Sequence, residues 1–214
     1  MFNFFRKNIN ERKLAKAKIE LSTVLQQNID DSENSIKEFS TMIADFRKHK
    51  YHRHDAFLNL CVFSSIVEID LTLLLERIQL SSRIQEKKLY ARVIAVTIVD
   101  YIENINVLIG KDCIKELQLN HMDHFIDEFK ALNKRFSMFR KANDFYLRDI
   151  RNNTLAHKCK DALTLKRAID RVDPDEIFSQ GMEVKAFGDE FVKISTKVLY
   201  FIIDYMTQGK KLNE

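Results

Sequence analysis

Glycine and proline are almost absent from this chain, and their scarcity limits the folds open to it more than any other feature. Among 214 residues there are four glycines and one proline. Folds rich in β-hairpins need these residues at many tight turns, so the composition is typical of long helices joined by short loops. Hydrophobic residues make up 45% of the chain, which is enough for a buried core. We therefore predict an all-α fold.

Apolar residues recur at helical spacing along most of the chain and predict where the helices lie. We expect an N-terminal helical arm over residues 1–50 and a bundle of four main helices with short accessory helices over residues 51–214. In the arm, helices are expected at about 11–28 and, after the capping residues Asp30-Asp31-Ser32, up to Phe46. In the bundle they are expected at about 55–79, 83–108 (ending at Gly110), 112–119, 125–150, 161–170, 174–178 and 183–207.

Two of these helices carry a regular apolar seam that predicts the buried face. In the long helix before residue 150 the seam consists of Phe125, Phe129, Leu132, Phe136, Phe139, Asn143, Tyr146 and Ile150. In the last helix it consists of Phe187, Phe191, Ile194, Val198, Phe201 and Tyr205. Steps of three and four place each seam on one side of its helix, facing a partner helix.

Two apolar stretches, residues 56–75 and 91–109, approach the length of a membrane span. Carboxylates interrupt both stretches, at Glu68 and Asp70 and at Asp100 and Glu103. Each carboxylate would cost about 2.5–3.5 kcal/mol in lipid, so we predict buried bundle helices and no membrane contact. The N-terminus lacks the long apolar run of a secretory signal, and three cysteines at unrelated spacings give no disulfide framework. We expect a cytoplasmic protein.

Positive charge is concentrated in one segment of the bundle. Residues 134–160 contain eight basic and two acidic residues. Such a cluster favours an anionic partner, although a solvated helix face has the same composition.

The peptide FYLRDIRNNTLAHKCK, residues 145–160, lies in this basic segment. Five residues separate Arg151 from His157, and Asn152 directly follows the arginine. Asn and Thr side chains compete with the backbone for hydrogen bonds, so Asn152-Asn153-Thr154 weakens the end of the helix. Along a regular helix, six residues rise about 9 Å and rotate about 120°, which makes the two side chains diverge. Either the helix loosens after Arg151, or two copies of the chain share one site.

This arrangement resembles the Arg-x4–6-His motif of the HEPN (higher eukaryotes and prokaryotes nucleotide-binding) superfamily. In that family a polar residue commonly follows the arginine and Ala-His is a frequent ending, as in Ala156-His157 here. The order of helices over roughly residues 51–208 is similar as well. Family members are compact helical bundles, and many are metal-independent ribonucleases. The resemblance implies a homodimer with both motifs at its interface, acting as a toxin or in phage defence.

An antitoxin or regulatory protein is a further partner that the resemblance implies. The residue two places after the histidine is Cys159. Family toxins that are silenced by a nucleotidyltransferase partner carry tyrosine there, so the resemblance does not extend to that kind of silencing.

The residues of the motif suit RNA cleavage without a metal. The ribose 2′-hydroxyl is the nucleophile, and His157 can accept its proton because unperturbed histidine titrates at about 6.5. Arg151 supplies a fixed cation for the charge that builds on the phosphoryl oxygens. Asn152 orients the phosphate or caps the helix. Three further cations, Arg148, Lys158 and Lys160, would hold the RNA backbone, and we expect no cofactor.

Two other functions agree with the same residues. A non-catalytic HEPN-like module would bind a nucleotide, RNA or a protein through the basic surface. In a purely structural bundle, Arg151 pairs with a carboxylate such as Asp144 or Asp149, and His157 caps the helix C-terminus.

Histidines elsewhere in the chain are candidate metal ligands. His49, His52 and His54 precede Asp55, but the lysines and arginine among them indicate a basic, exposed joint. His121 and His124 lack the paired Glu-x-x-His motifs of a di-iron site. We expect surface residues and no metal.

Overall fold

The computed structural model describes residues 2–155 and 161–211, which are almost entirely helical and contain no β-strand. The all-α fold is therefore confirmed for this part of the chain. The α-helices are α1 (Phe2–Lys48), α2 (Asp55–Leu80), α3 (Ile84–Val107), α4 (Ile114–Leu119), α5 (Ile126–Ile150), α6 (Ala162–Asp170) and α7 (Pro174–Lys211). Two π-helical turns, η1 (Leu108–Cys113) and η3 (Arg151–Leu155), and the 3-10 turn η2 (Asp123–Phe125) lie between them.

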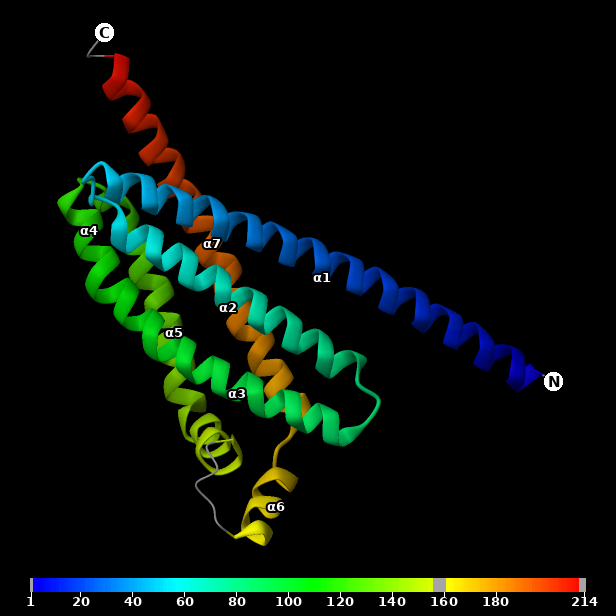
Figure 1. Ribbon diagram of the computed structural model, residues 1–214. Coiled ribbons are helices and arrows are strands. Elements are labelled where there is room, and N and C mark those ends of the chain that lie inside the picture. The colour runs from blue at the N-terminus through cyan, green and yellow to red at the C-terminus, as the bar shows by residue number, and fades with distance from the viewer. Residues whose placement is uncertain (1, 156–160, 212–214) are drawn as a thin grey trace.

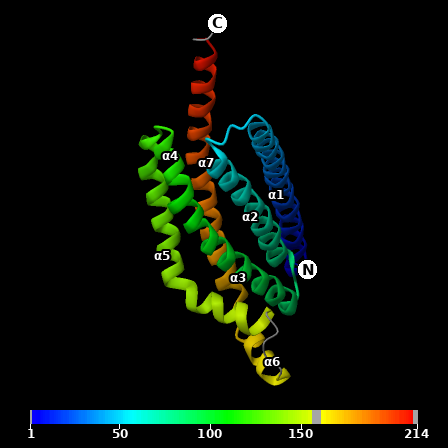
Figure 2. The ribbon, with the colours of Figure 1, turned by 60° about the vertical axis from the view of Figure 1, so that its left-hand side comes forward.

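The core lies between α2, α3, α5 and α7. The observed bounds of α2, α3 and α5 are close to the predicted ones. Helices α2 and α3 run antiparallel, and α5 and α7 pack beside them (Figures 1 and 2). The Phe136 ring lies between Tyr101 and Phe187, with centroid distances of 5.5 and 5.1 Å. The predicted seam of α5 is confirmed, since every member is buried or half-buried. The α5 seam therefore fixes which face of the helix is left for solvent.

Helix α1 is one continuous helix, so the predicted break at Asp30-Asp31-Ser32 is wrong. The two carboxylates accept hydrogen bonds from Gln26 and Gln27, each four residues earlier, at 2.9 Å. These bonds lie within the helix, so the aspartates stabilise it instead of capping a new one. The helix ends at Lys48, within the basic segment that was expected to end the arm.

The second half of α1 packs on the bundle. Ile29 and Ile43 are buried, and Phe39, Met42 and Phe46 pack against the core. The first half extends beyond α2 away from the other helices (Figure 1). The division into an arm of residues 1–50 and a bundle of residues 51–214 stays a prediction.

Helix α7 replaces two predicted helices, 174–178 and 183–207. Gly181 lies inside it, where an added Cβ would be 2.8 Å from Cδ2 of Leu75. The glycine therefore allows α7 to approach α2 closely and does not break the helix. The predicted burial of Phe201 and Tyr205 is also wrong: they are 36% and 62% exposed. The Phe201 ring contacts His124 and Phe125 at the edge of the bundle, with centroid distances of 5.0 and 5.9 Å.

Gly110 does not end α3 as predicted, because the chain continues through η1 into α4. The glycine lacks a positive φ, and an added Cβ would be 3.1 Å from Nδ2 of Asn133. As at Gly181, close packing between helices explains the glycine.

Two described segments, Asp55–Leu80 and Ile84–Leu119, are long and apolar enough to cross a membrane by length and composition. Core helices of soluble proteins pass the same test. The absence of membrane contact and the cytoplasmic location stay predictions.

Candidate functional site

The Arg151 motif begins where α5 changes its helical geometry. The α-helix ends at Ile150, and Arg151–Leu155 form the π-helical turn η3. π-turns have wider i→i+5 bonding and occur frequently at functional sites. The regular α-helix thus ends before Asn152-Asn153-Thr154, in agreement with the first of the two expected alternatives. The second, a site shared by two copies, stays a prediction.

Side-chain contacts hold this turn in place. Thr154 is buried, and its hydroxyl donates to the Ile150 carbonyl at 2.6 Å. Arg92 of α3 donates to the Thr154 carbonyl at 3.3 Å. Asn153 donates from its amide to Asp149 at 2.6 Å. The π-turn is therefore bonded both to α5 and to α3.

Arg151 is held by two carboxylates of α3. Its Nη2 lies 3.0 Å from Oδ1 of Asp100, and its Nη1 lies 3.9 Å from Oε2 of Glu103. The guanidinium is half-buried, and such pairs contribute only about 0–1 kcal/mol to stability. Their main effect is to orient the guanidinium.

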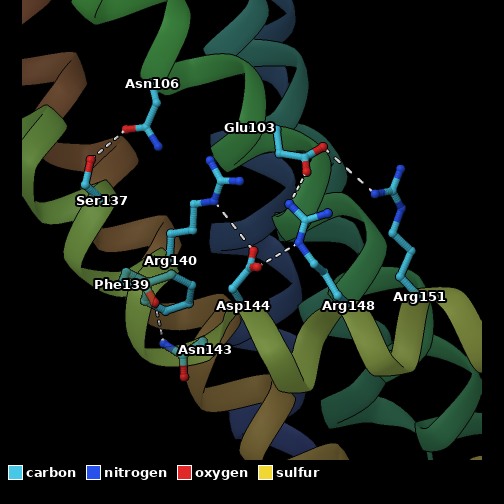
Figure 3. Close-up of polar contacts among 9 residues, drawn as sticks. All are labelled: Glu103, Asn106, Ser137, Phe139, Arg140, Asn143, Asp144, Arg148 and Arg151. Atoms are coloured by element: carbon cyan, nitrogen blue, oxygen red, sulfur yellow. Dashed lines mark hydrogen bonds and ion pairs between the residues drawn. The ribbon is translucent and has the colours of Figure 1, made fainter.

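Arg148 shares one of these carboxylates. It donates to Glu103, and its Nε donates to Oδ2 of Asp144 at 2.8 Å. These hydrogen bonds raise the pKa of Arg148 above its usual value, and the bond with Asp144 has the larger effect. Arg140 also pairs with Asp144, at 3.5 Å. The charged side chains therefore alternate in sign along the α3–α5 boundary (Figure 3).

The alternation partly offsets the positive charge of the basic segment. Asp100 and Glu103 lie on α3, outside residues 134–160. The charge count of that segment therefore does not include these two carboxylates. Lys134 and Lys141 of α5 are exposed and form no ion pair with another described residue. Asn152 is exposed as well. These three side chains are open to an anionic partner.

The other predicted site residues, His157, Lys158 and Lys160, lie outside the described residues, as does Cys159. The structure thus places Arg148, Arg151 and Asn152 together at the end of α5. Convergence of Arg151 with His157 stays a prediction.

Sequence reasoning missed Asp100 and Glu103 as partners of the motif. They were recognised only as charges that interrupt an apolar helix. Their spacing of three residues puts both on one face of α3, and this was the one available signal. A carboxylate pair on an otherwise apolar helix indicates a cationic partner, without identifying which cation.

The histidines of the joint make local contacts. His52 Nδ1 lies 3.1 Å from Oδ2 of Asp55, an oxygen that also accepts from Arg47 at 3.2 Å. His49 Nδ1 lies 2.8 Å from the Asp45 carbonyl. No cluster of three or more His, Cys, Asp or Glu that could hold a metal occurs among residues 2–155 and 161–211.

His54 is buried, contrary to the expected exposed joint. Its Nε2 lies 3.3 Å from the Tyr51 hydroxyl. Burial, with a smaller effect of Arg53, lowers its pKa to about 4. It therefore remains neutral in the folded protein near pH 7.

Comparison with known proteins gives no match to a protein family, to a curated protein or to a solved structure.

Proposed function

We propose that this protein is a metal-independent endoribonuclease of HEPN type, acting as a toxin or in phage defence. In this proposal helices α2, α3, α5 and α7 are the four main helices of a HEPN-like bundle, with α1 as an N-terminal extension. The observation that carries the proposal is the oriented Arg151 guanidinium at the start of a π-turn, with Asn152 exposed beside it. The histidine of the motif follows in the sequence within six residues.

The proposed reaction needs a cation, a proton acceptor and a proton donor. The 2′-oxygen attacks the adjacent phosphorus while His157 accepts the 2′-hydroxyl proton. The bond from phosphorus to the 5′-oxygen breaks, and the imidazolium of the second protomer protonates that oxygen. Arg151 stabilises the charge on the phosphoryl oxygens, and Asn152 orients the phosphate. The products carry 2′,3′-cyclic phosphate and 5′-hydroxyl ends.

Sharing the site across a homodimer supplies both proton-transfer groups. Twofold dimers are the commonest oligomers, and each chain has one motif histidine to contribute. Arg148, Lys158 and Lys160 hold the RNA backbone in this proposal. Because Arg148 is already paired with Glu103 and Asp144, RNA has to compete with these carboxylates for it.

Cleavage of RNA in excess chelator tests the proposal. We expect wild-type protein to cleave and Arg151→Ala or His157→Ala to lose about a hundredfold or more in rate, because each removes a group that acts in the transition state. Arg135→Ala is the matched control: Arg135 is also on α5 and pairs with Glu190, but lies sixteen residues before the motif. Intact RNA with wild-type protein, or full activity in both motif variants, contradicts the proposal.

A non-catalytic binding module is the second candidate. The ion pairs of Arg148 and Arg151 with α3 favour it, because they give both arginines a structural role. This candidate predicts RNA binding that weakens with salt and no cleavage.

A further inference from the structure

An exposed stripe of α5 leads to Asn152 and combines cations with large apolar side chains. Its members, at steps of four, three, four and seven residues, are Lys134, Met138, Lys141, Phe145 and Asn152. Phe145 is 89% exposed, more than any other large hydrophobic side chain in the described residues, and Met138 is 62% exposed. The opposite face of α5 is the buried seam, so this stripe is left without intramolecular packing.

A polar hollow of about 520 Å³ adjoins the stripe, between α3 and α5. Its lining residues are Asn106, Ser137, Arg140, Lys141 and Asp144. The Ser137 hydroxyl lies 3.3 Å from Oδ1 of Asn106 (Figure 3). Lys141 belongs to both the hollow and the stripe, and none of the lining residues is apolar. The hollow therefore offers cationic and amide donors to a ligand.

We propose that this stripe binds single-stranded RNA, with an unpaired base stacked on Phe145 and a backbone phosphate held in the hollow by Lys141 and Arg140. The proposal rests on the ribonuclease function above and names the form of RNA that the site takes. Phe145 and Asn152 are seven residues apart, about 10.5 Å along a helix. RNA bound on Phe145 thus continues toward Arg151.

The chemistry of the stripe favours a single strand over a duplex. An aromatic ring stacks on a base only when the base is unpaired, and exposed rings beside cations are typical of single-strand binding surfaces. In A-form duplex RNA the base faces are covered by their neighbours. Phe145 would then contribute nothing to binding.

The stripe also fits RNA better than a second copy of the chain. A stable protein interface buries about 800 Å² on each partner and has an apolar centre. Here two apolar side chains alternate with Lys134 and Lys141, and the adjoining hollow is polar. Both carboxylates at this surface are already engaged. Asp149 accepts a hydrogen bond from Asn153 at 2.6 Å. Asp144, in the lining of the hollow, pairs with Arg140 at 3.5 Å and with Arg148 at 2.8 Å.

RNA binding by full-length protein carrying His157→Ala, which prevents cleavage, tests the inference. A labelled single-stranded oligonucleotide and its duplex are titrated by fluorescence anisotropy. We expect tighter binding of the single strand and a loss of about fivefold or more with Phe145→Ala. Tyr200→Ala is the matched control, since Tyr200 is an exposed aromatic side chain of α7.

The phosphate contact has its own measurement. Lys141→Ala should lower the slope of log affinity against log salt by about 0.7, the value for one phosphate of a single strand. Lys193→Ala, an exposed lysine of α7, should leave the slope unchanged. An unchanged slope with Lys141→Ala overturns the phosphate assignment.

The stacking assignment is overturned if Phe145→Ala binds the single strand as tightly as the protein with Phe145 does. It is also overturned if the protein binds the duplex as tightly as the single strand. Either result holds even if wild-type protein cleaves RNA. If Phe145→Ala instead dissociates a dimer in sedimentation experiments and leaves RNA affinity unchanged, the stripe is a protein interface and the inference is wrong. Absence of cleavage with Phe145-dependent single-strand binding overturns only the nuclease function.

Discussion

At the residue scale, Glu116 shows how one side chain can complete a distant helix. Its two carboxylate oxygens accept the backbone N–H groups of Ala56 and Phe57 at 2.8 and 2.9 Å. No residue inside α2 can accept from these groups, because they lie in its first turn. His54, at the N-cap, makes no side-chain capping bond. Glu116 of α4 therefore acts as the cap of α2.

The cap has a pH dependence because burial raises the pKa of Glu116 to about 7, although its two backbone hydrogen bonds oppose the shift. Raising the pKa of a carboxyl on folding means that the folded state holds a proton which the unfolded state has lost. Stability is therefore lost as pH rises through about 7.

We expect the contribution of Glu116 to the free energy of unfolding to fall as pH rises from about 4.5 to about 7 and to level off above that, and Glu116→Gln to remove this fall. Glutamine cannot ionise, and it retains one oxygen acceptor, so the variant is less stable but less sensitive to pH. His54 acts in the opposite direction below about pH 7, because its pKa is lowered from 6.5 to about 4 on folding and the unfolded state therefore binds the proton more tightly. Both proteins contain His54, so the difference between their slopes reports Glu116 alone. Urea unfolding at several pH values measures the slopes, and equal slopes in both proteins would exclude Glu116 as the cause.

At the scale of elements, Glu103 of α3 binds two arginines of the neighbouring segment, Arg148 and Arg151. Glu103→Gln should cost about 1 kcal/mol or less in unfolding free energy, since the groups are partly exposed. It should lower RNA cleavage about tenfold or more, because Arg151 loses part of its orientation.

Glu128→Gln is the control for this prediction. It breaks a similar interhelical pair, with Lys197 of α7 at 2.6 Å, far from the motif. Urea unfolding and cleavage rates are measured on both variants. Equal cleavage rates would show that Glu103 has no role beyond packing.

The elements that sequence alone predicted well are those whose signals are local. Helix α2 was expected at about 55–79 and ends at Leu80, where the Ser81 hydroxyl donates to the Arg77 carbonyl at 2.7 Å. The errors occurred at Asp31, Gly110 and Gly181, which are typical of helix ends. Each stands inside a helix, at a place decided by side-chain bonds within the helix or by close contact with another helix. Tertiary contacts of this kind leave no local signal.

The candidate site was predictable to a similar extent. Spacing and residue type identified Arg151, Asn152 and a weakened helix end, because these depend on neighbouring residues. The carboxylates that hold Arg151 come from α3, about fifty residues earlier in the chain. No periodicity in α3 or α5 specifies which residues of the two helices meet. The sequence therefore did not predict that carboxylates of α3 would offset part of the positive charge of residues 134–160.

At the scale of the whole molecule, α1 has two halves with different roles. From Asn28 onward it borders a cleft of about 510 Å³ together with α2 and α7. Several apolar side chains of this half are buried or pack against the core: Ile29, Phe39, Met42, Ile43 and Phe46. The first half extends away from the bundle (Figure 1), and Ile19 and Val24 on it are exposed.

Truncation separates these roles. Deleting residues 2–25 should change the unfolding free energy by about 1 kcal/mol or less, because this half of α1 extends away from the bundle (Figure 1) and exposed positions such as Ile19 and Val24 contribute little. Deleting residues 2–48 should cost several kcal/mol, since each large apolar side chain returned to water costs about 1.5–3 kcal/mol. Urea unfolding followed by circular dichroism measures both losses. If the shorter deletion is equally destabilising and its effect depends on protein concentration, the free half of α1 is packed in an oligomer, and dimer formation involves α1 as well as the motif.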